Sequence, residues 1–79
     1  MKNHIIVCGG GEAGKNVITE LEKAKSDFVL IEKSQERVEE LLLHDKNMKY
    51  IIGDATDDSI LVSANINSAK GIILVLPSD

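Results

Sequence analysis

Four short runs of apolar residues divide the chain, and each predicts a buried β-strand. The runs are HIIVC at 4–8, FVLIE at 28–32, KYII at 49–52 and GIILVL at 71–76. The residues in each run are apolar almost throughout and do not alternate with polar ones. This pattern is typical of strands that are covered on both faces of a sheet.

Three segments between these runs carry apolar residues at helical spacing. The first extends over about 12–25, and its expected inward residues are Ala13, Val17, Ile18, Leu21 and Ala24. The second follows a cap at Ser34 and ends near His44; its expected inward residues are Val38, Leu41 and Leu42. The third is a short helix capped by Thr56 or Asp57, and its inward residues are Ile60, Leu61 and Ala64. The predicted order of elements is therefore βαβαβαβ.

Strands joined by helices predict a parallel sheet in an α/β fold. With right-handed crossovers the chain should form a Rossmann-type half-fold, in which four parallel strands take the order 3-2-1-4 and three helices cover them. The first two helices are expected on one face of the sheet and the third on the other. The fourth strand then lies at an exposed edge, and its apolar side chains predict more chain or a second copy beside it. Residues 1–79 are therefore expected to form a single domain, truncated after the fourth strand and self-associating.

The stretch IIVCGGGEAGKNV satisfies two phosphate-binding patterns at once. Gly9, Gly11 and Gly14 match the GxGxxG fingerprint of dinucleotide-binding domains. Gly9, Gly14 and Lys15 nearly match a Walker A loop, but Asn16 stands where a Ser or Thr should bind magnesium. The dinucleotide pattern fits better, with Gly14 packing the helix on the strand. The alternative is that the glycines only turn the chain.

The ends of the other strands carry further candidate ligands. Glu32 ends the second strand about 20 residues after the glycines, where a carboxylate can accept hydrogen bonds from an adenosine ribose. This favours NAD(H) over NADP(H), although Lys33 and Arg37 soften the repulsion of a 2′-phosphate. Asp54 follows the third strand and could reach an adenine edge, or could simply form a turn and a helix cap. Pro77 follows the fourth strand at the switch point of the sheet, or merely ends that strand.

Composition removes several function classes. A net charge of −4 and only two aromatic residues argue against nucleic acid as a partner. Cys8 is the single cysteine, which leaves no disulfide or metal quartet and fits a reducing cytoplasm. His4, expected to begin a strand in contact with solvent, and His44 have no partner acid or nucleophile, so no catalytic constellation is visible. No apolar run approaches the length of a membrane helix.

Four segments in order, HIIVCGGGEAGKNV, VLIEKSQERVEELL, YIIGDATDDSIL and INSAKGIILVLPSD, cover nearly the whole chain. Together they resemble the N-terminal nucleotide-binding domain of RCK/TrkA-type proteins, the regulators of potassium conductance and Trk potassium uptake. The resemblance implies a cytoplasmic Rossmann domain that binds NAD(H), ATP, ADP or AMP. It also implies dimers or larger homo-oligomers at the inner face of the membrane, where they gate a potassium channel or transporter.

The resemblance assigns binding roles to individual residues of this chain. The phosphates are expected at Gly9, Gly10, Gly11, Glu12 and Ala13. The outer ribose is expected at Glu32 and Lys33, the adenine near Asp54 and Ala55, and the inner ribose near Leu76 and Pro77. The chain departs from the family at Gly10, where a bulky residue is common, and in stopping after the fourth strand.

These observations predict a nucleotide-binding regulatory domain of a potassium channel or uptake system, and not an enzyme. Two alternatives stay open. The chain could be the cofactor-binding half of a small NAD-dependent dehydrogenase, since a Rossmann half-fold does not determine function. It could also be a structural homodimer in which the glycines only turn the chain.

Overall fold

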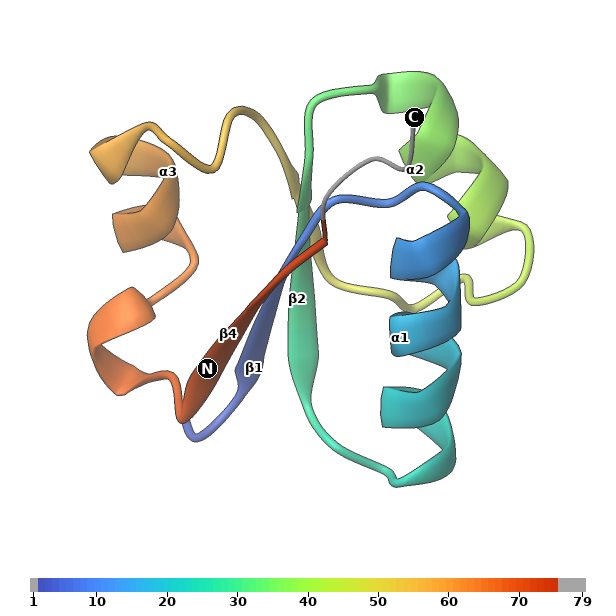
Figure 1. Ribbon diagram of the computed structural model, residues 1–79, viewed down its shortest axis with the longest axis horizontal. Coiled ribbons are helices and arrows are strands. Elements are labelled where there is room, and N and C mark those ends of the chain that lie inside the picture. The colour runs from blue at the N-terminus through green and yellow to red at the C-terminus, as the bar shows by residue number, and fades with distance from the viewer. Residues whose placement is uncertain (1, 76–79) are drawn as a thin grey trace.

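The computed structural model describes residues 2–75 and contains the predicted alternation of strands and helices (Figure 1). The elements are β1 (Ile5–Cys8), α1 (Glu12–Lys23), β2 (Phe28–Glu32), α2 (Gln35–Leu42), β3 (Tyr50–Ile52), α3 (Asp58–Ser63), the 3-10 turn η1 (Ile66–Ser68) and β4 (Gly71–Leu74). The turn η1 was not predicted. Ser34 caps α2 by accepting a hydrogen bond from the Arg37 N–H, and Asp57 caps α3 by accepting one from the Ser59 N–H.

The four strands form one parallel sheet in the order β3-β2-β1-β4, which confirms the predicted α/β half-fold. Cys8, the last residue of β1, pairs with Ile31 of β2 and with Leu74 of β4. The carboxyl ends of these three strands therefore meet at one edge of the sheet. In parallel α/β sheets this edge is where ligands bind.

Two apolar layers hold the helices to the sheet, one on each face. Alternate residues of β1 and β2 supply them, because successive side chains of a strand point to opposite faces. On one face Val7 and Leu30 pack with residues of α1 and α2, including Ile18 and Val38. On the other face lie α3 and η1, and there the apolar cluster is Ile6, Cys8, Val29, Ile31 and Ala64. Figure 1 shows α1 and α2 on one side of the sheet and α3 on the other, as predicted.

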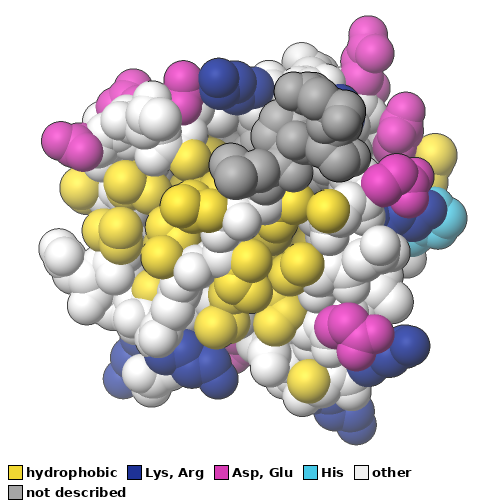
Figure 2. All heavy atoms as spheres, viewed as in Figure 1, with side chains coloured by type: hydrophobic (Ala, Val, Ile, Leu, Met, Phe, Trp, Pro, Cys, Tyr) yellow, Lys and Arg dark blue, Asp and Glu magenta, His cyan; other side chains and the backbone are white. Residues whose placement is uncertain are grey.

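The exposure of β4 agrees with its predicted place at an exposed edge, whereas β3 differs from the prediction that the strands are covered on both faces. Ile72 and Leu74 of β4 are 45% and 67% exposed, and Tyr50 and Ile52 of β3 are each 43% exposed. An edge strand has only one neighbour, and the helices cover mainly the two central strands. On the side of β4, which lies in front in this view, Figure 2 shows a band of apolar side chains.

Three single-residue expectations are wrong. Ala13 and Ala24 are exposed, because the first lies in the opening turn of α1 at the sheet edge and the second follows the end of that helix. His4 is fully buried and does not contact solvent. Its Nε2 lies 2.7 Å from the carbonyl oxygen of Ala64, because the segment after α3 packs over the start of β1.

Candidate functional site

A crevice of about 710 Å³ opens at the carboxyl ends of the strands. The loop after β1 forms one wall, the end of β2 forms the floor, and the loop after β3 forms the opposite wall. Its lining includes Gly9, Gly10, Gly11, Glu12, Ala13, Glu32, Lys33, Asp54 and Ala55. The fold therefore brings together residues that the sequence singled out in three separate loops.

The loop after β1 can adopt its shape only with glycine at two positions. Gly9 has φ +111°, in the left-handed region, and a Cβ there would lie 2.7 Å from the carbonyl oxygen of Val75. A Cβ on Gly14 would overlap the carbonyl group of Gly9. Gly14 lies behind the crevice and does not line it. It allows α1 to start directly against the end of β1, as the fingerprint predicted.

The first turn of α1 borders the crevice, since Gly11, Glu12 and Ala13 belong to its lining. Gly11 is the N-cap, and no side chain within residues 2–75 caps this helix end. The first N–H groups of a helix have no partner inside the helix, and they carry the positive end of its dipole. Such a helix start can bind an anionic group, a phosphate in particular.

Glu32 is held at the floor of the crevice by two backbone donors. Its Oε1 accepts a hydrogen bond from the Gly10 N–H at 2.7 Å, and its Oε2 accepts one from the Ser34 N–H at 2.7 Å. A carboxylate has about four acceptor positions, so both oxygens can still accept from a hydroxyl-bearing ligand. The same contacts tie the glycine loop to the end of β2.

Lys33 and Asp54 connect the ends of β2 and β3 across the crevice. The Lys33 Nζ lies 3.4 Å from the Asp54 Oδ2. Hydrogen bonds from the backbone N–H and hydroxyl of Thr56, with Lys33 as a smaller cause, lower the pKa of Asp54. Asp54 is therefore an ionised acceptor that closes a turn, while the cap of α3 is Asp57.

Several lining residues were not predicted from the sequence. Cys8, Ile31 and Leu74 are the last or next-to-last residues of their strands, so their place at the sheet edge was a usable signal. Burial raises the pKa of the Cys8 thiol, which keeps it protonated. Gly53, Thr56 and Val75 also line the crevice. Of the predicted residues, Leu76 and Pro77 lie outside the described residues.

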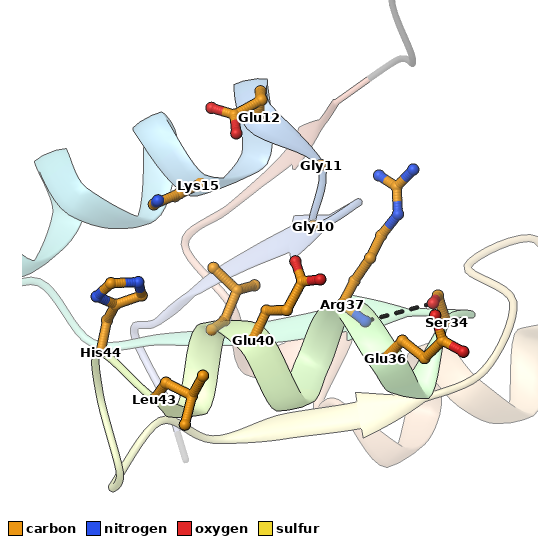
Figure 3. Close-up of a pocket in the computed structure, with 11 residues that line it drawn as sticks. Gly10, Gly11, Glu12, Lys15, Ser34, Glu36, Arg37, Glu40, Leu43 and His44 are labelled. Atoms are coloured by element: carbon orange, nitrogen blue, oxygen red, sulfur yellow. Dashed lines mark hydrogen bonds between the residues drawn. The ribbon is translucent and has the colours of Figure 1, made fainter.

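A second cavity, of about 540 Å³, lies between α1 and α2 (Figure 3). It shares Gly10, Gly11, Glu12 and Arg37 with the crevice and extends past Lys15 to His44. Figure 3 shows Arg37 reaching from the first turn of α2 toward Gly11, with Lys15 and His44 at the far end. No sequence pattern predicted this cavity.

Between residues 2 and 75, no three or more His, Cys, Asp or Glu side chains come together in a way that could hold a metal ion. None of the helices in the same part of the chain is long and apolar enough to cross a membrane.

Comparisons with known proteins place this geometry in a family. The family model of the TrkA-N domain matches residues 5–79. Potassium channel protein 1 of Methanocaldococcus jannaschii is 44% identical over the whole chain, which spans 24% of that protein. A Trk system potassium uptake protein TrkA homolog of Pyrococcus horikoshii is 33% identical over 96% of the chain and 33% of its own length.

A solved structure agrees in fold. The crystal structure of the TrkA-N domain of the inner membrane protein YbaL from Escherichia coli superposes with a TM-score of 0.87 at 29% identity. The match covers 99% of this chain and 56% of that one. The chain thus spans only part of the proteins that it resembles. Because the family model matches nearly the full sequence and this fold agrees with it, the chain belongs to the TrkA-N domain family.

Proposed function

We propose that this chain is an adenine-nucleotide-sensing regulatory domain of a potassium channel or potassium uptake system. NAD(H) is the favoured ligand, with ATP, ADP or AMP as alternatives. The observation that carries the proposal is the Glu32 carboxylate, clamped beside the glycine loop at the floor of the crevice. Carboxylates in this position accept hydrogen bonds from an adenosine ribose.

The crevice supports a specific placement of such a ligand. The ribose hydroxyls lie at Glu32 and Lys33, and the phosphates lie at the start of α1 next to Gly11. The adenine extends toward Asp54 and Ala55 at the end of β3. Leu76 and Pro77, proposed at the inner ribose, belong to the part of the chain that the structure does not describe.

The regulatory part of the proposal rests on the relatives. Two of them are named as a potassium channel protein and as a potassium uptake protein, and this chain covers only part of each. The domain would act as a homo-oligomer at the cytoplasmic face of a membrane-embedded pore subunit. A nucleotide that binds one arrangement of paired domains more tightly than another would shift the pore between its states.

A thermal-shift titration tests nucleotide binding. NAD, NADH, ATP, ADP and AMP are added to the wild type and to Glu32→Gln, with Glu39→Gln, an exposed carboxylate of α2, as the matched control. Ligand at ~100 times its Kd should stabilise the wild type and the control by about 2.7 kcal/mol, a rise in Tm of several degrees. Glu32→Gln should lose most of that rise.

Two outcomes would contradict the proposal. No shift with any nucleotide would mean that the glycines serve only the turn. Oxidation of NADH by the purified chain in the presence of small carbonyl compounds would favour the dehydrogenase alternative over a regulatory domain.

A further inference from the structure

Arg37 is the single arginine of a chain that carries thirteen acidic residues. Only two ion pairs join the side chains of residues 2–75, Lys23 with Glu20 and Lys33 with Asp54. The Arg37 guanidinium therefore has no carboxylate of these residues within 4.0 Å, although Glu36 and Glu40 lie on the same helix.

The guanidinium instead lies over the glycine loop. A Cβ placed on Gly11 would contact Nη1 of Arg37, and it would lie 3.7 Å from Cζ. Gly11 is also the N-cap of α1. The Arg37 guanidinium thus lies next to the N-cap of α1, where the first N–H groups of the helix have no partner inside the helix.

The position of Arg37 is set by its backbone. It occupies the first turn of α2, where its N–H donates to the Ser34 Oγ at 3.3 Å. Ser34 in turn donates its own N–H to Glu32. Hydrogen bonds therefore connect Ser34, which caps α2, to the Glu32 carboxylate and to the backbone of Arg37.

We infer that Arg37 holds a 5′-phosphate of the bound nucleotide against the start of α1. This inference rests on the proposed function and names one of its specificity-determining residues. A guanidinium presents several N–H donors in a plane and suits the oxygens of a phosphate. Arg37 also lines both cavities, so the phosphate that it holds sits where the crevice opens into the space between α1 and α2.

The test compares ligands that differ only in their phosphate. Isothermal titration of 5′-AMP, ADP, 2′-AMP and adenosine is carried out with the wild type, Arg37→Gln and Arg37→Lys. Loss of the charged donors should weaken 5′-AMP and ADP about tenfold or more and leave adenosine unchanged. Arg37→Lys keeps the positive charge but loses the planar set of N–H donors. Its affinity for 5′-AMP and ADP should therefore lie between those of the wild type and Arg37→Gln.

Lys46→Gln is the matched control, because it removes one positive charge at an exposed position that lines neither cavity. Its affinities should equal those of the wild type. The Gln variant should fold normally, since Arg37 is exposed and Gln suits the third position of a capped helix. An unchanged circular dichroism spectrum and Tm check this.

The outcomes separate this inference from the proposed function. If the wild type binds none of the nucleotides, the proposed function fails and the inference with it. If the wild type binds 5′-AMP and Arg37→Gln binds it equally well, only the inference fails. A loss confined to 2′-AMP would move Arg37 to the ribose edge, and an equal loss in Lys46→Gln would reduce its role to net charge; either result overturns the inference.

Discussion

At the residue scale, the crevice depends on positions where a side chain would occupy space that the backbone needs. Gly9 combines a positive φ with a close approach to Val75, and Gly14 lies against the carbonyl group of Gly9. Both serve the turn that joins β1 to α1. The polar residues of the crevice are restrained by backbone N–H groups. Glu32 accepts hydrogen bonds from Gly10 in the glycine loop and from Ser34, and Asp54 accepts one from Thr56 in its own turn.

Gly9→Ala should lower the free energy of unfolding by about 2 kcal/mol or more. The added Cβ would meet the carbonyl oxygen of Val75, and the φ of +111° is strained for any residue except glycine. Urea denaturation measures the change. Gly71→Ala is the control, since a Cβ there would meet only Ile5 at an ordinary 3.4 Å. Equal stability of the two variants would contradict the conclusion that the loop after β1 requires glycine at position 9.

At the element scale, α1 and α2 cover the same face of the sheet. A carboxylate from α1 and one that follows α2 contact each other beside this face. Glu22 lies in the last turn of α1 and Asp45 follows α2. A hydrogen bond with Asp45, followed by partial burial and repulsion between the two carboxylates, raises the pKa of Glu22 to about 7. The protonated form of Glu22 is therefore favoured in the folded chain.

A raised pKa makes the contribution of this contact depend on pH in a defined direction. The stabilisation is fully present below the unfolded value of about 4.5 and is lost as the pH rises through about 7. Glu22→Gln should therefore gain stability relative to the wild type between pH 5 and pH 8. Because Glu22 is mostly exposed, solvent screening should keep the gain to about 0.5 kcal/mol.

Urea denaturation of both proteins at pH 5 and pH 8 measures this difference, and other titrating groups cancel in the comparison. Glu20→Gln, two residues earlier at an exposed position of α1, is the control for the loss of a carboxylate from this helix. A wild type that gains stability over Glu22→Gln as the pH rises would contradict the assigned contact.

At the scale of the whole molecule, the sheet has an apolar edge at β4. Ile72 and Leu74 are exposed there, next to the unpaired side of the strand. An exposed apolar edge strand favours pairing with more polypeptide. In this chain, which spans only part of its relatives, a second copy is the partner that can be tested directly.

Ile72→Lys should reduce self-association of the chain, because a charged side chain on an edge strand opposes edge-to-edge pairing. Sedimentation velocity over a range of concentrations measures the oligomeric state. Leu43→Lys is the control, since Leu43 is 81% exposed but lies at the end of α2, away from β4. A wild type that stays monomeric at every concentration would remove the edge as a self-association surface.

Much of the site was predictable because its signals are local in the sequence. The glycine spacing, the carboxylate at the end of β2 and the GDAT turn each lie within a few residues of a strand end. Arg37 was visible only as a nearby charge, and its place over Gly11 depends on how α2 packs beside α1. The second cavity has no local signal, because two helices that are separate in the sequence form it together.

The sequence by itself determined the order of the strands and helices and the sheet order that follows from it. Apolar periodicity and right-handed crossovers are properties of short segments and of chain chirality, so they need no knowledge of distant contacts. The position of the glycine turn and of Glu32 at strand ends was determined in the same way.

Only the tertiary structure decided which side chains lose contact with water and which ones share a site. The buried ring of His4 has a hydrogen-bond partner in the carbonyl oxygen of Ala64, sixty residues later in the sequence. Glu32 is tied to the glycine loop because the N–H of Gly10, in that separate loop, donates a hydrogen bond to it. Such contacts join residues far apart in the chain, and their geometry exists only after the sheet has brought those segments together.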